Sequence, residues 1–160
     1  MTDKKELTSL LASSALKLQE MGLNHGATGN CSCRDGNTFL ITPSGVDTEN
    51  LSADKMVRMD FSGNIVESKF NLKPSSEWRF HQDIMSNREE VGAVVHTHSI
   101  YASSVSLFNK EIPPFHYMIA VAGGDSVRCA PYAMFGTQKL SDNIIGALDD
   151  RKACLIANHG

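Results

Sequence analysis

The sequence predicts an α/β protein in which helices pack against a mixed, mainly antiparallel sheet. Some segments carry apolar residues at helical spacing, whereas others are short apolar runs bounded by turn residues. The two kinds of segment alternate along the chain, as they do in proteins that layer helices on a sheet. A length of 160 residues suits one domain with one core, so residues 1–160 are expected to form a single domain.

Local signals place the elements in the first half of the chain. Leucines at helical spacing precede Gly22, a natural helix stop. Asp35-Gly36-Asn37 is a strong hairpin signal between two apolar runs. The elements expected here are a helix over residues 6–21, a hairpin of strands 30–34 and 38–42, and a hairpin of strands 55–60 and 64–68.

The second half alternates helices with strands. Ser75 or Ser76 is expected to cap a helix that runs to residue 87. Pro113-Pro114 interrupts the later pattern. The further elements expected are strands over residues 91–98, 116–121 and 153–159, and helices over residues 100–108 and 137–148.

The composition excludes several functions. The net charge of −3 offers no broad basic field for nucleic acid. No apolar stretch approaches the ~20 residues that span a bilayer, and residues 1–6 lack the apolar core of a leader peptide. The chain has no Cys-x-x-Cys pair, so its four cysteines are expected to be reduced and the protein to be cytoplasmic. The alternative is that the first two cysteines in the sequence bind a metal ion. They are Cys31, Cys33, Cys129 and Cys154.

Three histidines point to a metal site. His96 and His98 end an apolar run and would lie on one face of a buried strand. His159 ends a similar run. Three imidazoles leave a coordination position open, which is typical of catalytic zinc. The alternative is that these histidines are structural.

Glu77 lies at the expected N-terminus of a helix, where Ser75, Ser76 and free backbone N–H groups suit a phosphate. Its carboxylate could reach a metal or take a proton from substrate, or simply cap the helix. His81, one helical turn later, is expected to pack or hydrogen-bond, with orientation of Glu77 as the alternative. His25 and His116 are expected to be structural.

Five motifs follow one another along the chain: Gly29-Asn30-x-Ser32, Ile41-Thr42-Pro43-Ser44-Gly45, Pro74-Ser75-Ser76-Glu77, His96-Thr97-His98 and Asn158-His159-Gly160. They occur in the order found in class II aldolase/adducin proteins, which the chain resembles over nearly its whole length. Residues 75–81, 116–120 and 129–133 are most similar to the branch that cleaves L-fuculose 1-phosphate, and Glu77-Trp78-Arg79 favours an aldolase over an epimerase. The resemblance implies a three-layer α/β/α sandwich assembled as a homotetramer.

The resemblance also implies roles for individual residues. Zinc would be held by His96, His98 and His159, with Glu77 as a further ligand and as the catalytic proton carrier. Ala27 stands where the aldolases usually have threonine, and Thr28 follows it. The substrate phosphate would lie against Gly29, Asn30, Ser44, Gly45, Ser75 and Ser76, and the substrate would be positioned by Thr28, Phe135 and, from a neighbouring subunit, Tyr117.

The implied reaction is a zinc-dependent, reversible cleavage of a ketose 1-phosphate into dihydroxyacetone phosphate and an aldehyde. The alternatives are a pentulose-phosphate 4-epimerase or dehydratase of the same family, and a non-enzymatic adducin-like interaction module. The family carries a C-terminal helical tail with a proton-donating tyrosine. The chain is expected to lack this tail, because it ends directly after His159-Gly160.

Overall fold

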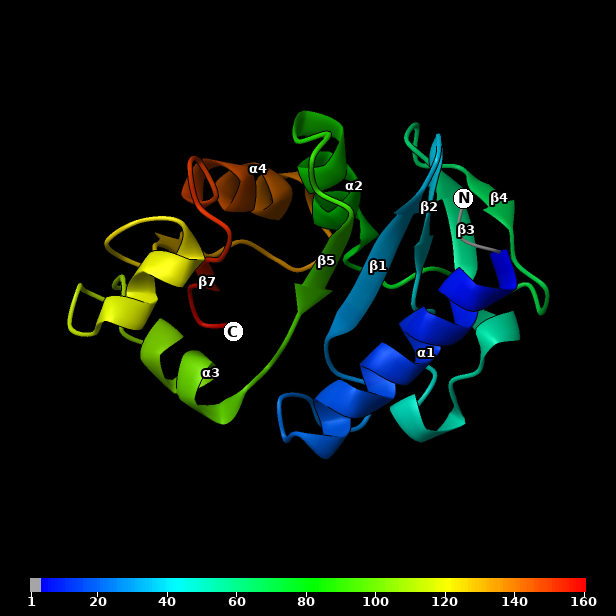
Figure 1. The fold of residues 1–160 in the computed structure, drawn as a ribbon, viewed down its shortest axis with the longest axis horizontal. Helices are drawn as coiled ribbons and strands as arrows, with labels where there is room; N and C mark the ends of the chain where they lie inside the picture. The colour runs from blue at the N-terminus through cyan, green and yellow to red at the C-terminus, as the bar shows by residue number, and fades with distance from the viewer. Residues whose placement is uncertain (1–3) are drawn as a thin grey trace. The chain divides into compact units, whose positions relative to one another are not determined.

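The structure is a computed structural model that describes residues 4–160 (Figure 1). The first three residues, part of the segment from which no leader peptide is expected, lie outside the described range. The chain divides into two compact units, one up to Thr97 and one from His98 to Gly160. In the part that the structure describes, no helix is long and apolar enough to cross a membrane.

The first unit is built on a five-stranded antiparallel sheet with the strand order β4-β3-β2-β1-β5. Both predicted hairpins and the first predicted helix are confirmed. The elements are α1 (Lys4–Glu20), β1 (Asn30–Asp35), β2 (Thr38–Ile41), η1 (Thr48–Asn50), η2 (Ala53–Lys55), β3 (Val57–Asp60), β4 (Ile65–Glu67), α2 (Trp78–Asn87) and β5 (Ala93–His96).

Helices cover both faces of this sheet, because side chains alternate between the faces along β2. Leu40 packs with Leu11 of α1 in one buried cluster. Phe39 and Ile41 point the other way and pack with Met85 of α2 in a second cluster. The first unit is therefore an α/β/α arrangement in three layers, as the resemblance implied.

One end of the sheet collects several loops. β1 begins at Asn30, which pairs with His96 at the end of β5. β2 ends beside them, and the Thr42 N–H donates to the Cys31 carbonyl at 3.0 Å. An isolated bridge between Pro43 and Pro74 then attaches the segment that leads into α2. Four separate stretches of the first unit thus meet at this end.

The second unit holds a two-stranded parallel sheet, on which α4 packs against β6 and α3 against β7. Helices were predicted over residues 100–108 and 137–148, and both are confirmed. The Thr137 hydroxyl caps α4 by accepting the Leu140 N–H at 3.3 Å. The elements are α3 (Ile100–Ser106), η3 (Tyr117–Ala122), β6 (Cys129–Ala130), α4 (Gln138–Ala147) and β7 (Leu155–Ile156).

The strand predicted over residues 116–121 is wrong, because this segment forms the 3-10 helix η3. His116 caps it, its ring Nδ1 accepting the Met118 N–H at 3.2 Å. Tyr117 and Val121 are exposed, at 81% and 63%, so the apolar pattern does not reflect a buried strand. Gly123, with φ at 99°, ends the helix in a left-handed conformation.

The two histidine-bearing strands are shorter than predicted. β5 ends at His96, so His98 lies beyond it and strand alternation does not place both rings on one face. The run is also not fully buried, since Val95 on this edge strand is 55% exposed. β7 stops at Ile156, and His159 lies in the turn that follows.

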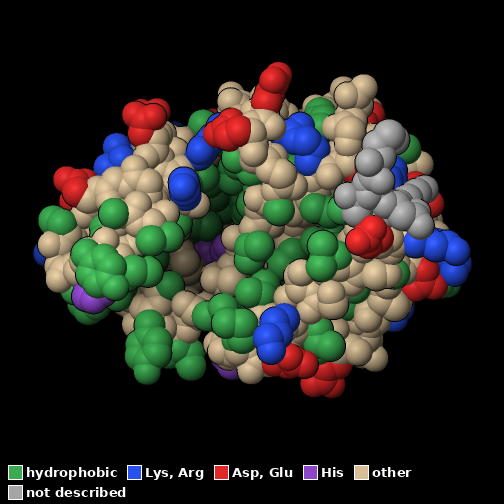
Figure 2. All heavy atoms as spheres, in the orientation of Figure 1, with side chains coloured by type: hydrophobic (Ala, Val, Ile, Leu, Met, Phe, Trp, Pro, Cys, Tyr) green, Lys and Arg blue, Asp and Glu red, His purple; other side chains and the backbone are tan. Residues whose placement is uncertain are grey.

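Charged side chains of both signs are interspersed on the face of the molecule that Figure 2 shows. This distribution agrees with the net charge of −3. A broad field of one sign, of the kind that attracts nucleic acid, is not seen on that face.

Candidate functional site

Glu77 and His96 form a buried pair in the first unit. Glu77, and not a serine, occupies the N-cap position of α2, where its side chain makes no capping hydrogen bond. Glu77 is only 6% exposed, as is His96. The Glu77 Oε2 lies 3.4 Å from the His96 Nε2. Phe80 meets the His96 ring edge-on, with centroids 5.6 Å apart, and so fixes the plane of the imidazole.

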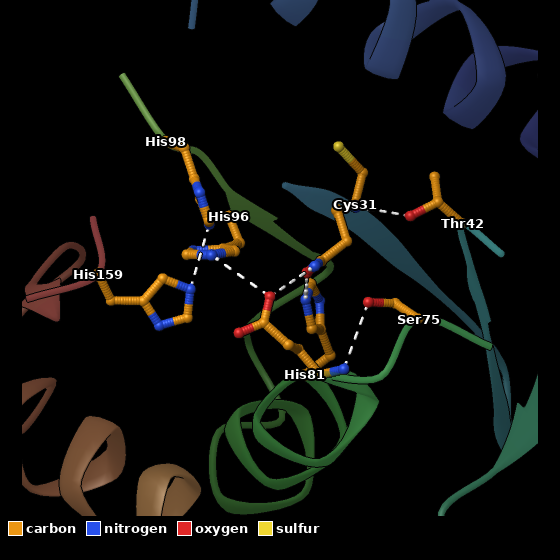
Figure 3. Close-up of polar contacts among 9 residues, drawn as sticks. Cys31, Thr42, Ser75, His81, His96, His98 and His159 are labelled. Atoms are coloured by element: carbon orange, nitrogen blue, oxygen red, sulfur yellow. Dashed lines mark hydrogen bonds and ion pairs between the residues drawn. The ribbon is translucent and has the colours of Figure 1, made fainter. Parts of the chain in front are cut away.

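His98 and His159 form a second pair, within the second unit. Their Nε2 atoms lie 3.1 Å apart, and their rings are almost perpendicular, at 89° (Figure 3). His159 follows Asn158, whose φ of 55° turns the chain sharply after β7. Burial lowers the pKa of His159, which favours the neutral ring that metal binding requires.

Both pairs have the spacing of metal ligands. Two ligands of a tetrahedral zinc ion, each about 2.0–2.1 Å from the metal, are about 3.3–3.4 Å from each other. The measured separations of 3.4 Å and 3.1 Å are close to this value. Each of the four side chains offers one ligand atom, and the nitrogen and oxygen donors suit zinc.

The predicted phosphate residues fall into two neighbouring groups. Ser44, Ser76 and Lys73 lie on the wall of a cavity of about 430 Å³ that is otherwise lined mainly by apolar residues, Met59, Ile65, Pro74 and Trp78 among them. The Ser44 N–H donates to the Lys73 carbonyl at 2.9 Å, which holds the two loops together. Ser75 is buried, and its hydroxyl accepts the Glu77 N–H at 3.3 Å. Gly45, with φ at 70°, closes the turn after Ser44.

Gly29 and Asn30 line a different and much smaller cavity, of about 20 Å³, at the start of β1. Gly29 has φ at +70°, and a Cβ there would lie 2.3 Å from the buried Asn24 side chain, so only glycine fits. The Thr28 hydroxyl donates to the His25 carbonyl at 2.7 Å and accepts the His25 N–H at 3.0 Å, which closes the turn before β1.

The remaining predicted positions, Tyr117 and Phe135, lie in the second unit. Their side chains are 81% and 63% exposed. The Tyr117 ring lies against the His116 ring, with centroids 4.7 Å apart. Within its own unit, each aromatic ring is therefore a surface feature.

The expectation that His81 packs or hydrogen-bonds is confirmed, but the sequence reasoning missed the buried chain of polar side chains that links His81 to Glu77. The Asn30 Nδ2 donates to the Glu77 Oε2 at 2.9 Å, so this side chain serves the carboxylate. The Asn30 Oδ1 in turn bonds the Nε2 of His81, whose Nδ1 lies 2.7 Å from the Ser32 Oγ. Two signals were present: Asn30 and Ser32 are two residues apart on a strand, and His81 is one helical turn from Glu77.

Comparison with known proteins gives a consistent result. A family description of the Class II Aldolase and Adducin N-terminal domain matches residues 9–160. The chain is 46% identical over 150 residues to the 5-methylthioribulose-1-phosphate/5-deoxyribulose-1-phosphate aldolase of Rhodospirillum rubrum, covering 94% of this chain and 66% of that protein. It is 43% identical over 158 residues to the L-fuculose phosphate aldolase of Escherichia coli, covering 99% and 72%.

A solved structure of an L-fuculose 1-phosphate aldolase superimposes with a TM-score of 0.91 at 39% sequence identity. The match covers 96% of this chain and 72% of that one. The predicted α/β fold is thereby confirmed. The chain spans about two thirds to three quarters of the length of these relatives.

Proposed function

Because the chain belongs to the class II aldolase and adducin family, as its motifs predicted, we propose that it acts as a metal-dependent aldolase. The proposed reaction is the reversible cleavage of a ketose 1-phosphate into dihydroxyacetone phosphate and an aldehyde. The observation that carries the proposal is that Glu77–His96 and His98–His159 each have the spacing of zinc ligands. A non-enzymatic, adducin-like interaction module would not need side chains with the spacing of zinc ligands.

One zinc ion is proposed to join the two pairs. His96 and His98 are separated by a single residue in the sequence, a spacing that suits two ligands of one ion. The proposed ligands are His96, His98 and His159, with Glu77 binding while substrate is absent. When bound, the ion supplies a Lewis acid that polarises the carbonyl and stabilises the negative charge left by carbon–carbon cleavage.

Glu77 is proposed to move the proton at the carbon that becomes nucleophilic. Its carboxylate is buried and fixed by the Asn30 amide, so it meets substrate in one orientation. The burial of Glu77 also keeps water away from the carboxylate, so that the proton passes between Glu77 and the substrate.

The substrate phosphate is proposed to lie at the sheet end that collects the Ser- and Gly-rich loops. The cavity of about 430 Å³ that Ser44 and Ser76 line has room for it, and Lys73 adds a positive charge. Ser75 and Gly45 are each next in sequence to a serine that lines the cavity, and they are proposed as further phosphate contacts, together with Gly29 and Asn30 at the start of β1. The phosphate would hold the three-carbon half so that its reacting carbon faces Glu77.

The substrate is proposed to be a ketose 1-phosphate with an apolar end. The relatives are named for L-fuculose phosphate, 5-methylthioribulose 1-phosphate and 5-deoxyribulose 1-phosphate, whose chains end in a methyl or methylthio group. The aldehyde released from each is short and apolar at its end. Tyr117 and Phe135 are exposed aromatic side chains that suit such a group, with Thr28 proposed at the mouth of the site.

The proposed assembly is a homotetramer in which Tyr117 reaches the site of a neighbouring copy. The second unit exposes large apolar side chains, including Phe108 at 72% and Phe115 at 73%, which favours burial against another copy. We place the protein in the cytoplasm, where charged sugar phosphates are retained. The two units are proposed to act as one family domain over residues 1–160.

The proposal is tested by measuring metal content and turnover together. Purified protein is analysed for zinc and incubated with the three ketose 1-phosphates, and dihydroxyacetone phosphate is followed with a coupled NADH-dependent reductase. Activity should disappear with chelator and return with zinc. Isomerised substrate without dihydroxyacetone phosphate would indicate the epimerase alternative. Absence of both stoichiometric zinc and turnover would indicate the adducin-like module.

Glu77→Gln tests the proton carrier. The variant keeps the shape of the side chain and should bind zinc through the histidines, but it should exchange the proton of dihydroxyacetone phosphate with D₂O at least about a hundredfold more slowly. Glu89→Gln, at an exposed glutamate after α2, is the matched control and should exchange like the wild type. Unchanged exchange in Glu77→Gln would contradict the assigned role.

A further inference from the structure

A continuous line of hydrogen bonds runs from the interior of the first unit to the proposed base. It joins Ser32, His81, Asn30 and Glu77, and all four side chains are buried. Ser32 and Asn30 come from β1, and His81 comes from α2. His81 has no exposed surface, and the line connects two layers of the unit.

The chemistry of the partners sets the direction of each bond. An ionised Glu77 carboxylate only accepts, so the Asn30 amide presents its NH₂ group to it. The Asn30 Oδ1 then faces His81 and must accept, so the His81 Nε2 carries the proton. A neutral ring with its proton on Nε2 has a free lone pair on Nδ1, which accepts the Ser32 hydroxyl.

We propose that His81 and Ser32 are positioning residues that act through Asn30. Together they hold its amide in one orientation, with the NH₂ group always towards Glu77. The proposal rests on the aldolase function, since the purpose of the arrangement is to fix the proton carrier. If Asn30 turned over, its Oδ1 would face the carboxylate and repel it, and the His81 N–H would lose its acceptor in a buried site.

The environment keeps His81 in this role. Complete burial lowers its pKa from the ordinary value of 6.5 to about 3, so the ring stays neutral at physiological pH. Phe80 stacks on it with centroids 4.6 Å apart, which fixes the plane of the ring. A ring that is neutral and fixed has one donor and one acceptor in fixed places, as the line requires.

The first experiment compares three variants in turnover. His81→Leu removes both ring bonds and should lower kcat by roughly 10- to 100-fold, with KM changed less than about threefold and zinc content retained. His81→Gln places an amide N–H near the position of Nε2 and should recover kcat to within about tenfold of wild type. Met85→Leu, at a fully buried position on the same helix, is the control for packing and should retain kcat.

Ser32 provides a second pair of variants. Ser32→Thr keeps the hydroxyl and should retain kcat within about threefold, whereas Ser32→Ala leaves the Nδ1 of His81 without its donor and should lower kcat by roughly tenfold. The proposal is overturned if folded His81→Leu keeps wild-type kcat. It is also overturned if His81→Gln and Met85→Leu lose as much as His81→Leu, since packing alone would then explain the loss.

A spectroscopic measurement tests the arrangement without using activity. In protein labelled with ¹⁵N-histidine, two-bond ¹⁵N–¹H correlations report which ring nitrogen of His81 carries the proton. We expect Nε2–H with an unprotonated Nδ1 between pH 6 and pH 8. A proton on Nδ1 would overturn the proposal. Nε2–H in a protein without aldolase turnover would mean that the proposed function, and not the hydrogen-bond line, has failed.

Discussion

Burial of His81 makes the free energy of unfolding depend on pH in a way that can be measured. In the folded protein its pKa is lowered to about 3 by desolvation, whereas the unfolded chain has the ordinary value of 6.5. Between these values the unfolded state binds a proton that the folded state does not. The free energy of unfolding therefore falls as the pH decreases through this window. Above pH 6.5 the His81 ring is mainly neutral in both states, and its burial then carries no protonation penalty.

The size of the effect follows from the two pKa values. Between pH 8 and pH 5 the proton that the unfolded His81 takes up lowers the free energy of unfolding by about 2 kcal/mol. His81→Gln has no titratable ring and loses this contribution. From pH 8 to pH 5, the free energy of unfolding of the wild type should therefore fall by ~2 kcal/mol more than that of the variant.

The assay is urea unfolding of metal-free protein at pH 8 and pH 5, at one protein concentration. Comparing the change in each protein cancels the groups that the two share. His25→Gln, at an exposed histidine, is the matched control for removing one imidazole and should follow the wild type. Equal losses in wild type and His81→Gln, within about 0.5 kcal/mol, would refute the account of His81 as a buried neutral ring.

Three further predictions concern stability and reactivity. Met85→Ala should cost about 2–5 kcal/mol in urea unfolding because Met85 is fully buried, whereas Met118→Ala, at a side chain 51% exposed, should stay within about 0.5 kcal/mol. Gly29→Ala should cost more than the ~1–2 kcal/mol of a left-handed residue, because its Cβ would also meet Asn24; wild-type stability in urea would disprove this. Burial raises the pKa of Cys154 to about 12, so iodoacetamide should alkylate it at pH 8 about a thousandfold more slowly than a free thiol; rapid labelling, read by mass spectrometry, would contradict this.

Local sequence signals predicted most of the fold. The Asp35-Gly36-Asn37 turn fixes a hairpin by its own backbone preferences, and Thr137 caps α4 with its own hydroxyl. Such signals act over a few residues, so they can be read without the rest of the chain. The prediction for residues 116–121 was wrong because the apolar side chains of this segment are exposed. A short apolar run does not by itself distinguish a strand from a short helix.

The candidate site shows the same division. The types of residue, and the one-residue gap between His96 and His98, were evident from the sequence and point to metal chemistry. The reason offered for their geometry was wrong, since His98 lies beyond the end of its strand. The contact of His98 with His159 depends on loops and turns, whose course is set by packing and not by periodicity.

The sequence alone sets the chemistry available and the local periodicity, including the placement of Asn30 and Ser32 on one face of β1. Packing between distant segments places α2 over that face and brings His81 between the two side chains, which no local pattern predicts. Burial then excludes water, and polar groups without water must bond one another. For this reason Asn30, predicted only to bind phosphate, holds the carboxylate of Glu77.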